Sequence, residues 1–214
     1  MKRIFFYVPN IIGYHRAVLL IVAFFFALNA PTVFIILYSV SYLLDILDGF
    51  TSRTLNQDSR FGAGLDMVID RSSTNCLLAI LAFRYPEMAP LFLILISLDL
   101  SSHYLHMLST TKASHKKTTP EQHGWVLHQY YSFRPFLTTL CFGHEAAALA
   151  LYALSFLSVP FFQAILSLFQ PSLLWWQPIP TVVFLVTAPL AILKTYISLI
   201  QLIQASRTLA AERH

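Results

Sequence analysis

Charged residues are scarce in this chain. Asp, Glu, Lys and Arg make up 11% of its 214 residues, whereas about 25% is usual for a soluble domain. There are only 6 glycines and 2 cysteines, which exclude a collagen-like chain and a disulfide-rich secreted module. Hydrophobic residues make up 57%, and the mean hydropathy is +0.64. This composition excludes a disordered chain and predicts an integral membrane protein.

The formal net charge is +4, and the cations are scattered over loops and chain ends. No basic face interleaved with aromatic residues is visible, so we do not expect a nucleic-acid partner. The positive net charge is better explained by a membrane protein whose cytosolic loops carry the excess of Lys and Arg.

Apolar runs of about 16 to 27 residues predict membrane-spanning helices. Because none of the runs alternates between apolar and polar residues, barrel strands are not expected. We predict an all-α integral membrane protein of six transmembrane helices with an amphipathic N-terminal segment, forming one domain over residues 1–214. The six predicted spans are Ile12–Leu28, Thr32–Leu47, Ala63–Phe83, Pro90–Leu108, Phe136–Phe156 and Ile179–Ala205.

The charges of the connections alternate along the chain, which predicts the orientation of the spans. One side carries Lys2, Arg3, Arg16, Arg53, Arg60, Lys112, Lys116, Lys117, Arg207 and Arg213. The other side has only Arg84, opposed by Glu87, and an uncharged connection, 157–178, in which Trp175 and Trp176 resemble interfacial anchors. Both termini are therefore expected in the cytosol, together with a polar loop over residues 112–129.

Acidic residues concentrate in one place. Five of the six aspartates lie between positions 45 and 70, and four of these form two pairs at helical spacing. Asp45 and Asp48 are three residues apart, and Asp66 and Asp70 are four apart, so each pair lies on one helix face. Since the two spans are consecutive and antiparallel, the acidic faces can meet at the cytosolic rim. Four converging carboxylates repel one another, and a hard divalent cation such as Mg²⁺ or Mn²⁺ would neutralise them.

Three interpretations of these carboxylates are open on composition alone. They are solvated helix caps, the lining of a cation pathway, or ligands of metal ions that clamp a phosphate-bearing substrate. Gly49 and Arg53 favour the last, because glycine permits close approach to the backbone and an arginine supplies a fork of donors for phosphate.

The same residues resemble a known signature. The pattern D-x2-D-G-x2-A-R-x8-G-x3-D-x3-D belongs to the CDP-alcohol phosphotransferases, and this chain matches its spacing throughout. Ser52 is the one departure, because the family usually has Ala there. The matching positions are Asp45, Asp48, Gly49, Arg53, Gly62, Asp66 and Asp70.

Further segments resemble the eukaryotic phosphatidylinositol synthases, a branch of this family, and together they cover most of the chain. They are residues 8–16, 70–78, 97–106, 130–135, 140–145 and 194–198. The resemblance implies transfer of a phosphatidyl group from CDP-diacylglycerol to myo-inositol with release of CMP. It also implies two Mg²⁺ or Mn²⁺ ions per site, a homodimer, and a multi-pass protein of the endoplasmic reticulum, with the Golgi as a further location and the active site facing the cytosol.

The resemblance also assigns roles to residues. Asp45, Asp48 and Asp66 become metal ligands, and Asp70 becomes both a ligand of the second ion and the general base. The CDP-diacylglycerol site is formed by Gly49, Ser52, Arg53, Gly62 and Asn10.

Acceptor-binding candidates are the remaining cations near the predicted site or inside a span, Arg71, Arg134 and Lys194. A different acceptor (inositol phosphate, glycerol phosphate or serine) and a divalent-cation transporter remain as alternatives.

Overall fold

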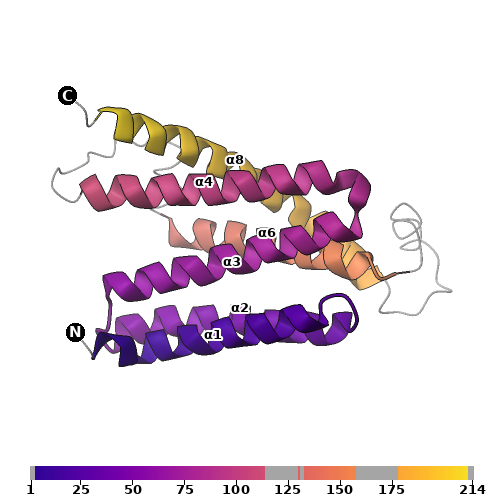
Figure 1. Cartoon of the computed structure of the whole chain (residues 1–214), viewed down its shortest axis with the longest axis horizontal. Coiled ribbons are helices and arrows are strands. Elements are labelled where there is room, and N and C mark those ends of the chain that lie inside the picture. Colours follow the sequence, from indigo (N-terminus) through magenta and orange to yellow (C-terminus); the bar gives the residue numbers. More distant parts are fainter. Residues whose placement is uncertain (1–2, 114–129, 131–132, 158–177, 212–214) are drawn as a thin grey trace. The chain divides into compact units, whose positions relative to one another are not determined.

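The computed structural model describes residues 3–113, 130, 133–157 and 178–211, and in these ranges every regular element is helical (Figure 1). The elements are η1 (Ile4–Phe6), α1 (Val8–Phe26), α2 (Pro31–Thr54), α3 (Arg60–Arg84), η2 (Pro86–Met88), α4 (Ala89–Ala113), α6 (Arg134–Leu154) and α8 (Pro178–Ala211). The prediction of an all-α protein is confirmed for these residues.

Prolines mark most helix starts. Pro9, Pro31 and Pro135 lie in the first turns of α1, α2 and α6, where the missing N–H would have no intrahelical partner and the fixed φ suits the helix. The predicted break between the first two spans is present, because α1 ends at Phe26 and α2 begins at Pro31.

Several helices run further into the polar segments than the predicted spans, although α1 and α6 each end two residues early, at Phe26 and Leu154. α2 continues past Leu47 to Thr54, and α3 already begins at Arg60, so Arg53 and Arg60 are helical residues and not loop residues. A hydropathy pattern marks where apolar side chains end, but helical hydrogen bonding continues into the polar segment that follows. The connection between these helices is therefore only residues 55–59.

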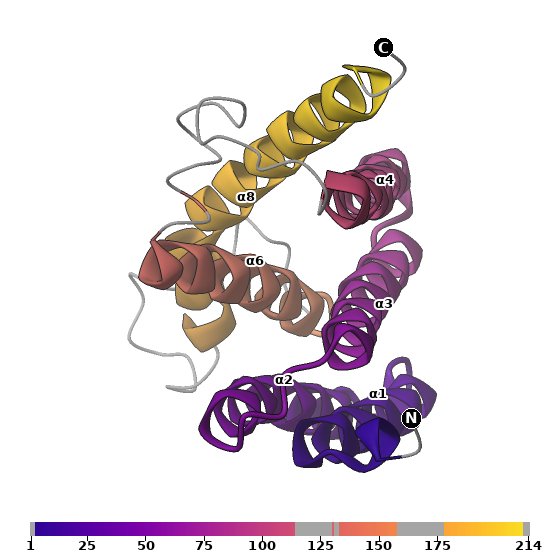
Figure 2. The same cartoon turned by 90° about the vertical axis from the view of Figure 1, so that its left-hand side faces the viewer.

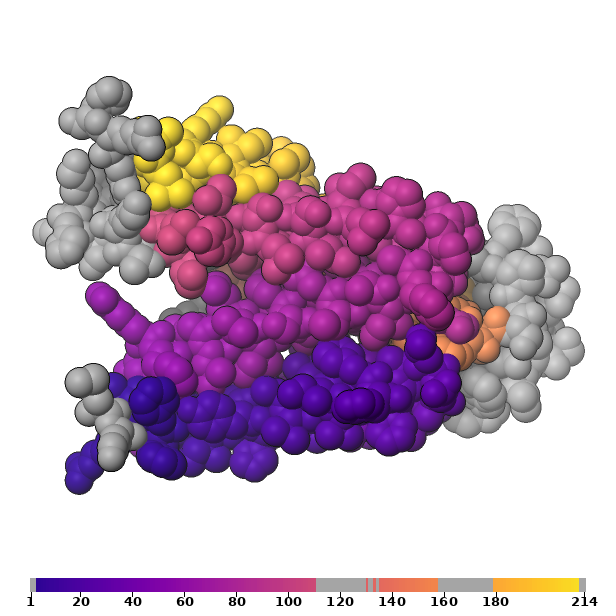
Figure 3. Space-filling model, viewed as in Figure 1, coloured from indigo at the N-terminus to yellow at the C-terminus, as the bar shows by residue number. Residues whose placement is uncertain are grey.

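Within the described residues, five helical segments are long and apolar enough to cross a membrane: Val8–Phe26, Pro31–Thr54, Pro86–Thr110, Pro135–Leu154 and Ile179–Ala211. The remaining predicted span, Ala63–Phe83, corresponds to α3, which has 25 residues but carries Asp66, Asp70 and Arg71. In the space-filling view, atoms of α1 form part of the surface that faces the viewer (Figure 3). Most of the exposed side chains of α1 are apolar, among them Val18, Ile21 and Phe25, as expected for a surface in contact with lipid.

Contacts divide the chain into two units, residues 1–76 and 77–214. In the first unit, α1 and α2 lie side by side and antiparallel in both cartoon views (Figures 1 and 2). Phe34 lies between the rings of Phe24 and Tyr38, at centroid distances of 6.3 and 5.5 Å. This packing fixes the register in which the middle of α1 faces the second half of α2.

In the second unit, α8 packs against α6 and α4. A Cβ at Gly143 of α6 would lie 2.6 Å from the side chain of Leu190, so the close approach of α6 to α8 requires glycine there. Tyr130, Leu140 and Ile197 form the buried core beside this crossing. At the end of α6, Arg84 Nε donates a 3.1 Å hydrogen bond to Ser155 Oγ.

Two predicted features lie outside the described residues. They are most of the polar loop 112–129, since α4 covers only Lys112 and Ala113 of it, and most of the connection 157–178 with Trp175 and Trp176. The predicted amphipathic N-terminal segment is a single 3-10 turn, η1, which leads directly into α1.

Candidate functional site

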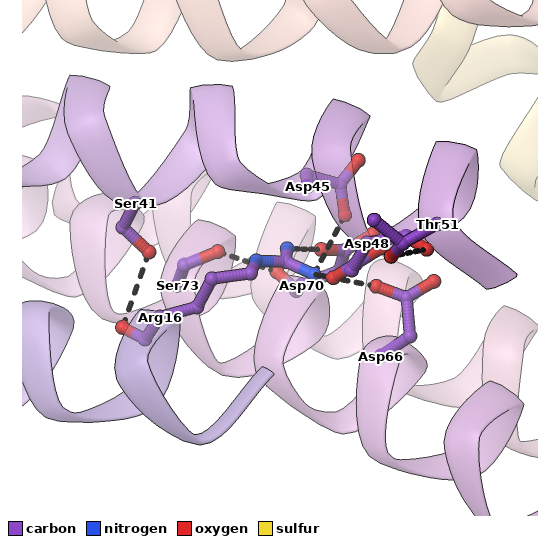
Figure 4. A network of polar contacts seen from close by, with 8 residues as sticks. All are labelled: Arg16, Ser41, Asp45, Asp48, Thr51, Asp66, Asp70 and Ser73. Atoms are coloured by element: carbon purple, nitrogen blue, oxygen red, sulfur yellow. Dashed lines mark hydrogen bonds and ion pairs between the residues drawn. The ribbon is translucent and has the colours of Figure 1, made fainter. Parts of the chain in front are cut away.

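The four aspartates come together in the first unit around one guanidinium group (Figure 4). Nη1 of Arg16 lies 2.7 Å from Asp45 Oδ1, 2.7 Å from Asp48 Oδ2 and 2.7 Å from Asp66 Oδ1. Nη2 of Arg16 lies 2.6 Å from Asp70 Oδ1. The helical spacings thus predict correctly that the two acidic faces meet.

Arg16 is the residue that sequence reasoning misses. It was assigned only to the cytosolic positive charge, yet its side chain is 2% exposed and reaches from α1 to both acidic helices. Ser41 Oγ of α2 donates a 3.2 Å hydrogen bond to the Arg16 carbonyl, which fixes the backbone at this point. A signal was available, because a cation within an apolar run is a functional candidate by default.

The donor set fits a hard metal ion. One carboxylate oxygen each from Asp45, Asp48 and Asp66 lie within 4.8 Å of one another. Opposite ligands of an octahedral Mg²⁺ are about 4.2 Å apart, so this spacing is close to what one ion needs. The nitrogen among these oxygens has only two hydrogens for three acceptors, whereas a spherical cation can attract all three equally.

A cavity of about 530 Å³ adjoins the cluster in the first unit. Asp48 and Asp66 belong both to the cluster and to the cavity wall. The wall also contains all five residues predicted to bind the nucleotide lipid: Asn10, Gly49, Ser52, Arg53 and Gly62. The structure therefore gathers the predicted nucleotide residues beside the predicted metal ligands.

Sequence reasoning missed the contribution of the α2–α3 connection to this wall, where Gln57, Asp58 and Ser59 also line the cavity, followed by Arg60 at the start of α3. Gln57 Oε1 accepts a 2.8 Å hydrogen bond from the Val8 N–H at the start of α1. Ser59 Oγ accepts a 2.9 Å hydrogen bond from the Gly62 N–H, as a helix cap does. A serine directly before a helix was the signal for the second contact, while the first is tertiary and has no local signal.

Ser52, the departure from the family pattern, has a specific partner. Its hydroxyl donates a 2.5 Å hydrogen bond to Asp58 Oδ1, so it ties the last turn of α2 to the connection. This bond holds a carboxylate of the cavity wall in one position. The family's usual alanine could not make it.

For the transfer reaction that the resemblance implies, we expect Ser52→Ala to leave the kcat nearly unchanged and to raise the KM for the nucleotide lipid about threefold. The reason is that one exposed hydrogen bond contributes about 1 kcal/mol or less. Steady-state kinetics with CDP-diacylglycerol measure this, and Thr54→Ala is the matched control, because the Thr54 hydroxyl donates only to backbone carbonyls of its own helix. A larger loss of kcat in Ser52→Ala than in the control would contradict the modest role.

The three acceptor candidates lie on three different helices. Arg71 follows Asp70 on α3 and is partly buried in the first unit. Arg134 is the first residue of α6, and its side chain is outside the described part. Lys194 belongs to the second unit, where it is 4% exposed and its Nζ donates a 3.1 Å hydrogen bond to Ser198 Oγ. A cavity of only about 10 Å³ adjoins Lys194, with Asp99 and His144 in its wall.

Fold and site together define a class: an all-helical protein with several helices suited to a membrane, which gathers four carboxylates beside a polar cavity. The chain belongs to the CDP-alcohol phosphatidyltransferase family, whose sequence model matches residues 6–210. Members of this family generally use divalent metal ions, in agreement with the donor set.

Curated relatives are similar over nearly the whole chain. The CDP-diacylglycerol–inositol 3-phosphatidyltransferases of Mus musculus and Homo sapiens are each 43% identical over 213 residues, which cover 98% of this chain and 94% of theirs. The protein of the same name from Schizosaccharomyces pombe is 39% identical over 219 residues, covering 97% of this chain and 90% of its own. No solved structure matches the chain.

Proposed function

We propose that this protein synthesises phosphatidylinositol by transferring the phosphatidyl group of CDP-diacylglycerol to a hydroxyl of myo-inositol, with release of CMP. The observation that carries the proposal is the junction of cluster and cavity, where Asp48 and Asp66 belong to both. A diphosphate in the cavity would thus lie next to the carboxylates. The names of the relatives supply the acceptor, inositol.

Asp45, Asp48 and Asp66 would hold one ion, Mg²⁺ or Mn²⁺, and Asp70 would join them in holding a second. When bound, two such ions neutralise the diphosphate and stabilise both the attacking and the leaving oxygen. The reaction forms a bond from the inositol oxygen to the lipid phosphorus and breaks the bond from that phosphorus to the bridging oxygen, which leaves with CMP. Asp70 orients the attacking hydroxyl and accepts its proton.

The nucleotide lipid would occupy the 530 Å³ cavity. Arg53 offers donors to the phosphates, and Asn10 and Ser52 offer polar groups to the cytidine and its ribose. Gly49 and Gly62 carry no side chain, so a ligand in the cavity can approach the backbone closely at these positions. A Cβ at Gly49 would meet nothing closer than Arg53 Nη1, at 3.4 Å, so this face of the cavity has room for a ligand.

The proposal includes an orientation and a location. We place both termini and the active site on the cytosolic side of a six-span protein of the endoplasmic reticulum, with the Golgi as a further location, and we propose a homodimer. Charge supports the orientation, because Arg53 and Arg60 flank the connection beside the cavity. A cytosolic site would let a water-soluble acceptor enter while the acyl chains of the donor remain in the bilayer.

The test is CMP release by the purified full-length protein in detergent with CDP-diacylglycerol and Mn²⁺, in parallel with inositol, inositol phosphate, glycerol phosphate and serine. Turnover with inositol alone is the expected result. Turnover with another acceptor instead would overturn the acceptor assignment and retain the chemistry. Absence of turnover with all four, together with Mn²⁺ flux into liposomes that contain the protein, would favour a cation transporter.

For the acceptor site we propose Arg71, Arg134 and Lys194. We expect Lys194→Met to raise the KM for inositol about tenfold or more, because a buried ammonium contributes strong hydrogen bonds to hydroxyl oxygens. The KM for CDP-diacylglycerol should stay unchanged. Steady-state kinetics with each substrate varied in turn measure both values.

The matched control for Lys194→Met is Ser198→Ala, which removes one partner of the Lys194 ammonium, the hydroxyl 3.1 Å from Nζ, but keeps its charge. If Lys194→Met lowered the midpoint of thermal unfolding and left both KM values as they are, Lys194 would be a packing residue of the second unit. Rescue of the inositol KM by Lys194→Arg would support a role in binding.

A further inference from the structure

We infer that Arg16 is a built-in counter-cation that competes with divalent ions for the four carboxylates and so sets the metal affinity of the site. This inference rests on the proposed metal site. It starts from the position of the guanidinium, which contacts Asp45, Asp48, Asp66 and Asp70 at 2.6 to 2.7 Å. Figure 4 shows the side chain extending from α1 between the two acidic helices.

Geometry makes the two cations mutually exclusive. Nη1 lies 2.7 Å from one oxygen each of Asp45, Asp48 and Asp66, and these carboxylates can bring one oxygen each within 4.8 Å of one another. A metal ion bound by the three oxygens would lie about 2.0–2.5 Å from each of them. It would therefore occupy the same small volume as Nη1, so Nη1 must leave before the ion can bind.

Charge balance shows why the guanidinium can be displaced. Arg16 is in direct contact with four carboxylates, and Arg71, the next residue to Asp70 on α3, adds a second positive charge that acts on Asp70. Two guanidinium charges do not balance four carboxylates, so the cluster retains an excess of acidic groups. Two divalent ions would balance the carboxylates fully. Electrostatics therefore favours exchange of the guanidinium for the ions once they are available, while a monovalent ion brings no more charge than Arg16 already supplies.

Hydrogen bonding also favours displacement. Nη1 has two hydrogens for three acceptors, and the buried Nε has no hydrogen-bond partner among the described residues. The side chain is thus held by charge more than by a matched set of directional bonds. Its backbone, in contrast, is anchored by the bond from Ser41 Oγ to the Arg16 carbonyl, so the side chain can swing away while α1 stays in place.

Arg16 has two opposing effects in this arrangement. It stabilises the cluster against the mutual repulsion of its carboxylates, so the ligands are already gathered when an ion arrives. It also weakens ion binding, because each ion must first displace it. A residue that only supported the ligands would strengthen ion binding, and this difference in sign makes the inference testable.

The experiment measures Mn²⁺ binding to the full-length protein in detergent, without substrate, by the loss of the free-ion electron paramagnetic resonance signal. We expect Arg16→Gln to bind the first Mn²⁺ roughly tenfold or more tightly than the unsubstituted protein, because a cation in contact with the site is gone. Arg16→Lys should fall between the two. The control is Arg207→Gln, which removes the same charge at an exposed position of α8 and should leave the affinity unchanged.

Thermal unfolding of the same variants provides a second readout. Arg16→Gln should unfold at a lower temperature without metal and gain far more from added Mn²⁺ than the unsubstituted protein does. If Arg16→Gln folds only with Mn²⁺, the inference is supported. If it does not fold under either condition, tighter Mn²⁺ binding by Arg16→Lys supports the inference, and equal or weaker binding overturns it.

Equal or weaker Mn²⁺ binding by a folded Arg16→Gln, with binding by the unsubstituted protein intact, would overturn the inference and leave the proposed function standing. Binding by neither protein would overturn the metal site and the inference together. CMP release, measured separately, reports on the proposed reaction in either case.

Discussion

Asp70→Asn is expected to lower the kcat for CMP release about 10³-fold or more, since it removes both the proton acceptor and one ligand of the second ion. Asp70 is geometrically distinct within the cluster. Arg16 Nη2 contacts it alone at 2.6 Å, whereas Nη1 is shared by the other three carboxylates. The group of three that can hold one ion does not include Asp70. Binding of the first Mn²⁺ should therefore survive the substitution within a few-fold.

Asp48→Asn is the contrasting variant. It belongs to the group of three and is the most buried of the four aspartates, so its substitution should abolish both turnover and tight Mn²⁺ binding. Both changes are isosteric and keep an oxygen for Arg16, so folding should be retained, as thermal unfolding can verify. Glu87→Gln, exposed on η2, controls for the loss of one negative charge. Equal loss of Mn²⁺ binding in Asp48→Asn and Asp70→Asn would contradict separate roles.

Much of the site is readable from the chain because its order is local. Asp45 and Asp48 are one turn apart on α2, and Asp66 and Asp70 are one turn apart on α3, so helical spacing fixes each pair. A short connection then forces the two helices to run antiparallel. The convergence of the carboxylates follows from these two facts with no knowledge of the rest of the fold.

Arg16 escapes prediction because its contacts are not local in the sequence. Its separation from Asp70 is 54 residues, and the contact depends on the register between α1 and α2. That register is set by packing of Phe24, Phe34 and Tyr38, which no spacing rule predicts. A cation within an apolar run is a candidate functional residue, but it also has an alternative explanation as a topology signal, and the local sequence does not decide between the two.

The ends of the helices were also hard to predict. Hydropathy locates the apolar part of α2, but the helix continues through the mostly polar segment from Asp48 to Thr54 because its backbone bonds do not depend on side-chain polarity. The consequence is functional. Gly49, Ser52 and Arg53 lie on a rigid helix beside the cavity and not on a loop.

Gly62→Ala is expected to raise the KM for CDP-diacylglycerol at least tenfold and to lower the midpoint of thermal unfolding. A Cβ at this position would lie 2.8 Å from Asn10 Oδ1 and 3.1 Å from Ser59 Oγ. Neither neighbour can move freely. Asn10 is 2% exposed and its Nδ2 donates a 2.6 Å hydrogen bond to the Ile4 carbonyl, while Ser59 Oγ caps α3. The substitution therefore displaces two polar groups of the cavity wall.

The chain supplies a matched control two residues away. A Cβ at Gly64 would meet nothing within 4 Å, so Gly64→Ala should fit without displacement. Because alanine is the better helix former, it should leave the KM unchanged and stabilise the protein by up to about 1 kcal/mol. Steady-state kinetics and thermal unfolding of both variants separate crowding of the cavity from a general effect of losing a helical glycine. Similar KM values for the two variants would contradict the placement of the nucleotide against Asn10 and Gly62, and would move the candidate binding surface toward Gly49 and Arg53.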